Sequence, residues 1–139
     1  MIKGSCMCGG IRFELDATRS FTHCHCRNCR KLRGATFASY VHVEADKFRM
    51  LSGEGLLQQF ESAPGSFRAF CRICGSIAPS SVPYLKTVSV PAGLLDDDPG
   101  VRPQLHVFAG SKAPWWAITD GLPQHEKWMP GFGPQAQGG

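Results

Sequence analysis

The chain has 139 residues, 42% of them hydrophobic, with 15 basic and 11 acidic side chains and a formal net charge of +4. This length suits one domain with a single core, and the charge lacks the strongly basic balance of a typical nucleic-acid-binding domain. The first residues lack the apolar segment of a signal peptide, and no apolar run approaches the roughly 20 residues of a membrane helix. Composition therefore predicts a cytoplasmic protein with no membrane partner and with reduced thiols that are available for metal.

Strand patterns outnumber helix patterns along the chain. The segments in which apolar and polar residues alternate, or which lead into a cysteine pair, are residues 11–15, 37–43, 56–60, 67–70, 87–90 and 105–108. Only residues 28–33 favour a helix, which Gly34 would end in the C′ position. The sequence therefore predicts a mainly β fold of a single domain, with few and short helices.

Two segments read as irregular structure. Residues 96–100 have the sequence of an exposed turn, with three aspartates before Pro99 and Gly100. Residues 131–139 are rich in glycine, glutamine and proline, which predicts a flexible C-terminal tail. We therefore expect the folded domain to occupy residues 1–130.

Seven cysteines form the most specific feature of the chain. Two of them, spaced C-x-C, lie near the start, and two others, spaced C-x-x-C, lie far downstream. Each such pair folds as a knuckle whose sulfurs face one ion, and two pairs together supply the four thiolates of a closed tetrahedral zinc site. A shared ion would close a long loop and stabilise the fold. The four predicted structural ligands are Cys6, Cys8, Cys71 and Cys74.

The middle cysteines differ from these pairs. Cys24, Cys26 and Cys29 can place three thiolates on a second ion, and no cysteine is left to complete the shell. An open coordination position is where metal chemistry takes place. These residues lie between a strand and the predicted helix, whose first amides can lower the pKa of a thiol. The sequence predicts a reactive site here.

Three other interpretations stay open at this stage. Disulfides are disfavoured by the odd number of cysteines and by spacings that bridge only with strain. An iron–sulfur cluster needs clustered thiolates, yet C-x-C-x-x-C matches neither common ferredoxin spacing. In the third interpretation a histidine closes the middle site and makes it structural. The candidate histidines are His23, His25, His42, His106 and His125.

Basic residues surround the middle cysteines. Their positions invite a nucleic-acid hypothesis, but acidic residues such as Glu14 and Glu44 flank them on both sides, and no basic stripe with interleaved aromatics is present. The positive charges would instead favour thiolate forms or hold an anionic ligand, unless they only form a solvated helix face. The residues concerned are Arg27, Arg30, Lys31 and Arg33.

These motifs together carry a family resemblance. Residues 4–10, 23–31 and 70–76, followed by the segment 106–124, resemble the glutathione-dependent formaldehyde-activating enzyme (GFA) family, which also includes centromere protein V. The resemblance extends from about residue 4 to residue 130, which identifies residues 1–130 as a GFA-type zinc-binding domain.

The resemblance implies a fold, two Zn²⁺ ions and a reaction. The fold would be a β-tent of antiparallel sheets, with a structural zinc on the four outer cysteines and a catalytic zinc on Cys24, Cys26 and Cys29. The reaction would be that of a carbon–sulfur lyase: the reversible addition of glutathione, or a similar thiol, to formaldehyde or another small aldehyde. The partners would then be small-molecule substrates, and the oligomeric state is not indicated.

Substrate contacts can be assigned to three residues. Arg27 could bind a carboxylate of glutathione, Trp115 could form part of an apolar wall, and Asp120, or alternatively His106, could transfer a proton or orient a group. Each of these residues also has a purely structural interpretation.

The alternative function is a noncatalytic zinc-binding module for a protein or nucleic-acid partner, in keeping with the centromeric member of the family. The open second site, and the absence of a long basic arm, favour the enzyme.

Overall fold

The computed structural model describes residues 1–131 and 133, and these residues form the mainly β fold that the sequence predicts. The strands are β1 (Ile2–Ser5), β2 (Arg12–Leu15), β3 (Ser20–Cys24), β4 (Ala38–Glu44), β5 (Phe48–Ser52), β6 (Leu57–Ala63), β7 (Ser66–Cys71), β8 (Ser80–Val82), β9 (Thr87–Pro91) and β10 (Leu105–Val107). The α-helix is α1 (Arg27–Arg33), and the short 3₁₀ helices are η1 (Ala45–Lys47), η2 (Glu54–Leu56), η3 (Pro83–Leu85), η4 (Ala92–Leu94) and η5 (Ala109–Ser111). Among these described residues, no helix is both long enough and apolar enough to span a membrane.

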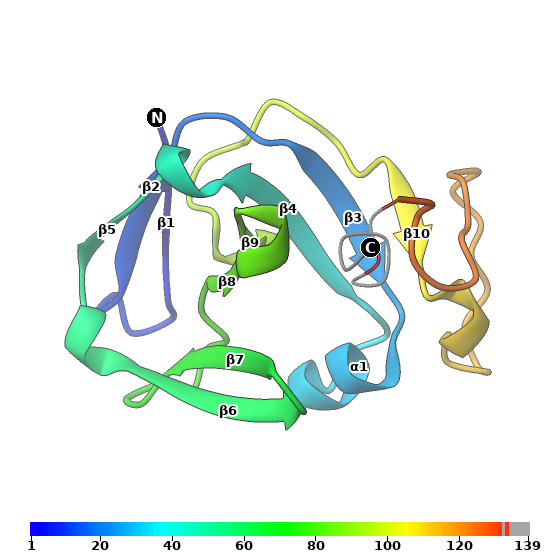
Figure 1. Cartoon of the computed structure of the whole chain (residues 1–139), viewed down its shortest axis with the longest axis horizontal. Coiled ribbons are helices and arrows are strands. Elements are labelled where there is room, and N and C mark those ends of the chain that lie inside the picture. Colours follow the sequence, from blue (N-terminus) through cyan, green and yellow to red (C-terminus); the bar gives the residue numbers. More distant parts are fainter. Residues whose placement is uncertain (132, 134–139) are drawn as a thin grey trace.

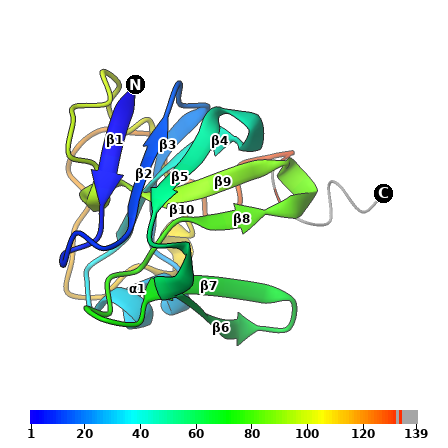
Figure 2. The same ribbon diagram turned by 90° about the vertical axis from the view of Figure 1, so that its left-hand side faces the viewer.

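The strands form three sheets (Figure 1). One has the order β1-β2-β5, the second has the order β10-β3-β4-β9-β8, and the third is the β6–β7 hairpin. Within the described residues, β10 and β3 form the one parallel pair of named strands, and the other strand pairs are antiparallel. Figures 1 and 2 both show α1 beside one end of the β6–β7 hairpin. The last residue of β3 and the first turn of α1 therefore lie close to that hairpin.

The main core lies between the three-stranded and the five-stranded sheet. Phe13 on β2 is fully buried, and its ring stacks on Phe48 with 5.5 Å between the centroids. A Cβ atom at Gly4 would overlap the Phe13 ring and crowd the carbonyl of Leu94, so β1 can approach the core only with glycine at this position. The other apolar residues that the two sheets bury together include Leu15, Val41, Val43, Val88 and Val90.

Each predicted strand is present with shifted ends, and the predicted helix begins one residue earlier, at Arg27. Gly34 adopts the left-handed backbone expected of a C′ residue, with φ of 56°. Four strands have no counterpart among the predicted ranges, namely β1, β3, β5 and β8. These strands have three to five residues, so they offer few positions at which apolar and polar residues could alternate.

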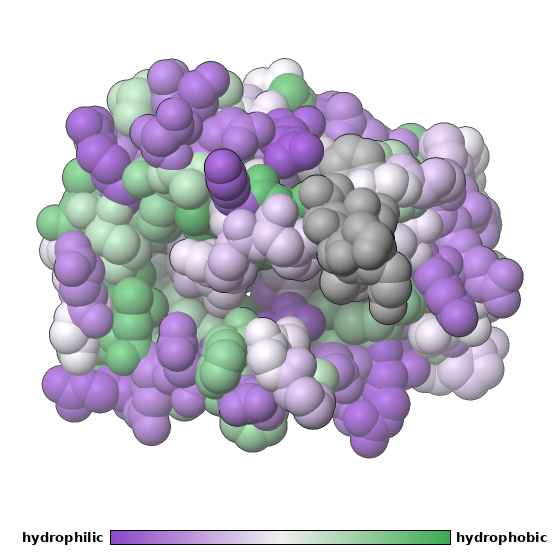
Figure 3. Space-filling model, in the orientation of Figure 1, coloured by the Kyte–Doolittle hydropathy of each residue, from purple (hydrophilic) through white to green (hydrophobic). Residues whose placement is uncertain are grey.

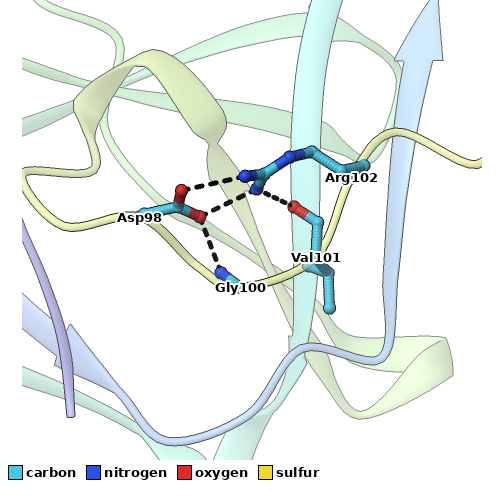
Figure 4. Close-up of polar contacts among 4 residues, drawn as sticks. All are labelled: Asp98, Gly100, Val101 and Arg102. Atoms are coloured by element: carbon cyan, nitrogen blue, oxygen red, sulfur yellow. Dashed lines mark hydrogen bonds and ion pairs between the residues drawn. The ribbon is translucent and has the colours of Figure 1, made fainter.

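The bend predicted at residues 96–100 is exposed and held by polar contacts (Figure 4). The carboxylate of Asp98 accepts hydrogen bonds from Nη1 and Nη2 of Arg102, at 2.8 and 3.0 Å, and from the amide of Gly100 at 2.8 Å. The Arg102 hydrogen bonds, followed by the Gly100 amide, lower the pKa of Asp98 to about 2. The predicted tail, 131–139, falls largely outside the described residues, so the domain boundary stays a prediction.

The face of the molecule seen in Figure 3 carries both hydrophilic and hydrophobic areas. Figure 3 shows a hollow in this face, between the β6–β7 hairpin and strands β8 and β9, with hydrophilic surface inside it. On the face seen in Figure 3, this hollow separates the β6–β7 hairpin from strands β8 and β9 of the five-stranded sheet.

Candidate metal centres

The four outer cysteines converge from two distant segments. Cys6 and Cys8 follow β1, whereas Cys71 ends β7 and Cys74 lies in the turn after it. Their four Sγ atoms lie within 4.8 Å of one another, with 3.5 Å between Cys6 and Cys8 and 3.8 Å between Cys8 and Cys71. Four thiolates at such distances fit one tetrahedral metal ion.

Each outer pair is shaped by a tight turn that ends in glycine. Gly9 and Gly75 both have φ of 77°, and their amides donate to the carbonyls of Cys6 and Cys71, at 2.9 and 2.8 Å. This left-handed conformation favours glycine, which follows each pair in the sequence. The amide of Met7 donates to Oγ of Ser76 at 3.0 Å, so the two knuckles are also joined directly.

The three middle cysteines converge at the junction of β3 and α1. Cys24 is the last residue of β3, Cys26 is the N-cap of α1, and Cys29 is buried in the first turn of the helix. The sulfur of Cys26 accepts a hydrogen bond from the amide of Cys29 at 3.3 Å, as an N-cap side chain does. The three Sγ atoms lie within 4.8 Å of one another.

Two residues from strands of different sheets polarise the sulfur of Cys29. Arg68 on β7 donates from Nη1 to the hydroxyl of Tyr40 on β4 at 3.3 Å, which leaves the hydroxyl proton of Tyr40 for Cys29 Sγ, 3.4 Å away. Nη2 of Arg68 lies 3.9 Å from the same sulfur. Hydrogen bonds from the Cys24 and Cys26 thiols, and then from Tyr40 and the charge of Arg68, hold the pKa of Cys29 far below its usual range despite burial. Cys29 is therefore set up as a thiolate.

The middle cluster has three protein ligands rather than four. Among the described residues, no histidine or carboxylate joins the three sulfurs within the same 4.8 Å. His23 instead shares a hydrogen bond of 2.8 Å with Ser39, and His25 points its Nε2 at His106. The interpretation in which a histidine closes this site is therefore not supported by the geometry.

A chain of hydrogen bonds leads from His25, beside the middle cluster, to the exposed carboxylate of Asp120. His25 Nε2 lies 2.8 Å from His106 Nδ1, and His106 Nε2 lies 2.8 Å from Oδ2 of Asp120. Both histidines are buried, and burial lowers the pKa of His25 to about 4. A neutral His106 that donates to Asp120 must accept at Nδ1, so His25 carries its proton on Nε2. Asp120 thus orients the residue between Cys24 and Cys26 through His106.

The residues predicted to contact substrate are dispersed. Arg27 is exposed at the start of α1, and Trp115, 70% exposed, lies in the loop after η5. In the described part of the chain, neither forms a hydrogen bond or ion pair with the cysteines. Asp120 reaches the cluster only through the two histidines. The structure therefore does not bring these three residues together at one point.

Sequence reasoning missed the neighbours of Cys29. Tyr40 and Arg68 fall inside predicted strands, where a polar side chain between apolar ones is usually solvent-facing. Only the pairing of the strands and the packing of the hairpin against α1 bring them to the sulfur.

All seven cysteines are free thiols in the structure, and six of them are buried or partly buried. The protein is therefore a small, mainly β protein with one cluster of four cysteines and one of three, each of which could hold a metal ion. The donor sets fit zinc: the first closes a tetrahedron, and the second leaves a position open.

Comparison with known families identifies one family within this class. The family model described as glutathione-dependent formaldehyde-activating enzyme matches residues 1–111, so the chain belongs to the GFA family. The resemblance drawn from the cysteine motifs is confirmed.

Comparison with solved structures supports the fold. A Rhodobacter sphaeroides protein, determined by crystallography as a structural genomics target, matches with a TM-score of 0.58 and 23% sequence identity. The match covers 73% of this chain and 91% of that protein. The search of curated proteins found no match.

Proposed function

We propose that the protein is a zinc-dependent carbon–sulfur lyase. It would catalyse the reversible addition of glutathione, or a similar thiol, to formaldehyde or another small aldehyde. A carbon–sulfur bond forms, the carbonyl becomes a hydroxyl group, and the proton moves from sulfur to oxygen. Membership of the GFA family supports this proposal. The observation that carries it is the three-cysteine cluster, whose sulfurs converge without a fourth protein ligand.

The two clusters would have different roles, one holding a structural metal ion and the other a reactive one. Cys6, Cys8, Cys71 and Cys74 would hold a structural zinc, and Cys24, Cys26 and Cys29 would hold a second one. When bound there, zinc would supply an open position that binds a thiol as thiolate or polarises an aldehyde oxygen.

The protein residues around the middle cluster would prepare it for this chemistry. Tyr40 and Arg68 add to the effect of Cys24 and Cys26 in favouring the thiolate form of Cys29, which is the form that binds metal. The N-cap geometry fixes Cys26 against the amide of Cys29. These contacts are made by buried or partly buried groups, so little rearrangement is needed when a substrate arrives.

The hydrogen-bonded histidines would hold the cysteine ligands in position. His106 fixes the ring of His25, whose backbone joins Cys24 to Cys26, and the amide of His25 donates to the carbonyl of Val107 at 3.0 Å. Asp120, at the exposed end of this chain, fixes the tautomer of His106. Arg27 and Trp115 are exposed and would meet a ligand only at the rim of the site.

The test is exchange-detected NMR of glutathione with formaldehyde. Zinc-loaded protein would be compared with a Cys24→Ser/Cys26→Ser/Cys29→Ser variant and with the uncatalysed reaction. Lys47→Gln, an exposed cation on η1, serves as the charge control. We expect exchange to be accelerated by the native protein and by the Lys47 variant, but not by the triple variant. A protein that holds two metal ions and accelerates nothing would contradict glutathione–formaldehyde chemistry and leave another thiol substrate or the noncatalytic alternative.

A further inference from the structure

The outer edge of the β6–β7 hairpin has no partner strand. In the described part of the chain, β6 pairs with β7 and with no other strand. Figures 1 and 2 both show β6 on the outside of the hairpin, at the lower boundary of the molecule, with no other ribbon beyond it. The edge is therefore open to a strand from another molecule.

The hydrogen bonds of the hairpin show which main-chain groups this edge presents. The amide of Arg72 donates to the carbonyl of Leu56 at 2.9 Å, so the main chain of Leu56 faces β7. On β7, the amide of Ala69 donates to Oγ of Ser80 at 3.1 Å, away from β6. Main-chain groups alternate between the two sides of a strand. The residues of β6 whose amides and carbonyls face outward are Leu57, Gln59 and Glu61.

The edge lacks the features that usually protect a free strand. Its seven residues include no lysine, arginine or proline, and the register of the hairpin becomes irregular only beyond Glu61. The outer strands of the five-stranded sheet, β8 and β10, have three residues each. β6 is therefore long and regular enough to pair with another strand.

The hairpin exposes a phenylalanine on each of its two faces. Phe60 is opposite Arg68, and Glu61 is opposite Phe67, so the two phenylalanines lie on different faces. Their exposed fractions are 54% and 49%. Arg68 reaches the sulfur of Cys29 from its face of the hairpin. Phe60 therefore lies on the face that is turned toward the middle cluster.

Two copies of β6 are complementary when they pair antiparallel about a two-fold axis. Phe60 then faces the partner's Phe60 in a pair without main-chain hydrogen bonds, where side chains lie closest. On either side, Gln59 and the partner's Glu61 exchange main-chain hydrogen bonds, and the Gln59 amide can donate to the facing carboxylate.

Charge and polarity favour this register over its neighbours. A shift of two residues in one direction would set Leu57 against the partner's Glu61. A shift in the other direction would place the two Glu61 carboxylates opposite each other, which is unfavourable. The register centred on Phe60 avoids both mismatches.

The joined edges would form a sheet with the strand order β7-β6-β6-β7. A two-stranded hairpin is marginal by itself, whereas a wider sheet is more stable. Figures 1 and 2 show that the rest of the molecule lies on the β7 side of the hairpin, so it would not block the contact. Each copy offers this edge once, so the assembly closes at two copies.

We propose that β6 pairs with β6 of a second copy of this chain and forms a two-fold dimer. Short paired strands with one exposed aromatic residue each bury less than the roughly 1,200–2,000 Å² of stable complexes. The dimer should therefore be weak and depend on protein concentration. This proposal does not depend on the reaction that the protein catalyses.

Sedimentation equilibrium of the zinc-loaded protein, at concentrations up to about 1 mM, tests the association. We expect a monomer–dimer equilibrium. Gln59→Pro removes an outward amide that the hairpin does not use, and Phe60→Ser removes the facing aromatic pair. Each should weaken the dimer by about tenfold or more. Phe67→Ser, which changes the other face of the same hairpin, is the matched control and should leave the dimer unchanged.

Hydrogen exchange followed by NMR locates the contact in the native protein. The amides of Gln59 and Glu61 should become protected as the protein concentration rises. The amide of Phe60 already faces β7 and should change little. This measurement decides the matter even if a variant does not fold.

Three results would overturn the proposal. The first is a native protein that stays monomeric up to about 1 mM, which would leave the edge for an extended segment of another protein. The second is a dimer that forms without protecting the amides of Gln59 and Glu61. The third is a dimer that folded Gln59→Pro and Phe60→Ser variants form as tightly as the native protein.

Discussion

The two cysteine clusters offer similar sulfur ligands in different surroundings. The four-cysteine cluster joins β1 to the end of β7, across a long stretch of chain, and is held by backbone turns. The three-cysteine cluster is local in sequence, and Tyr40, Arg68 and a chain of two histidines surround it. Ligand type alone does not separate structural from reactive sites. We propose that the number of cysteines and the polar groups around them distinguish a structural site from a reactive one.

The largest expected effect comes from breaking the four-cysteine cluster. Cys71→Ser/Cys74→Ser should unfold the domain, since a structural zinc site contributes about 10 kcal/mol and the whole domain is stable by a similar amount. Circular dichroism during thermal melting would show this as the loss of a cooperative transition. A soluble double variant that still melts cooperatively would mean that this cluster does not hold the fold.

A smaller but substantial effect should follow from removing His106. His106→Phe leaves the buried Nε2–H of His25 without an acceptor, and we expect a loss of about 2–3 kcal/mol in the free energy of unfolding. Chemical denaturation measures this loss. Asp120→Asn, at the exposed end of the same chain, is the matched comparison and should cost much less. Equal losses of unfolding free energy in the two variants would show that the buried His25–His106 hydrogen bond is not the source of the stability.

Tyr40→Phe should weaken metal binding at the three-cysteine cluster and leave the four-cysteine cluster unchanged. It removes the hydroxyl that faces Cys29 and keeps the ring, so metal affinity at the three-cysteine cluster should fall by about tenfold. Competition with a chromophoric chelator would resolve a weaker and a tighter site. Tyr84→Phe, the matched control at the second tyrosine of the chain, should leave both sites unchanged. If Tyr40→Phe weakened the four-cysteine site instead, the assignment of Tyr40 would be wrong.

The smallest effect near neutral pH should come from His42, because its contribution changes only as acid is added. Burial lowers the pKa of His42 on β4 from 6.5 to about 4, so the folded state resists a proton that the unfolded chain accepts. Its contribution to stability is complete above pH 6.5 and is lost as the pH falls toward 4. His42→Gln should flatten the pH dependence of the melting temperature in this window. An unchanged slope would assign that dependence to other groups.

The sequence predicted local features well. Knuckle spacing, the C′ glycine and the alternation in β2, β4 and β7 are set by neighbours in the chain, so they could be read directly. The sequence could not supply the side-chain contacts that depend on the packing of segments far apart in the chain. Arg33 was one of four equivalent cations in the sequence, and only the packing of α1 against β4 distinguishes it. Asp120 and His106 were named as alternatives, whereas a hydrogen bond of 2.8 Å makes them successive members of one chain.

The most direct test of the division between the clusters is the metal content and melting of the Cys24→Ser/Cys26→Ser/Cys29→Ser variant. Mass spectrometry under native conditions would count the bound ions, and calorimetry would follow unfolding of the same sample. We predict a folded protein with one zinc ion in place of two and a cooperative melting transition. Loss of both ions, or collapse of the fold, would contradict the separation of a structural site from a reactive one.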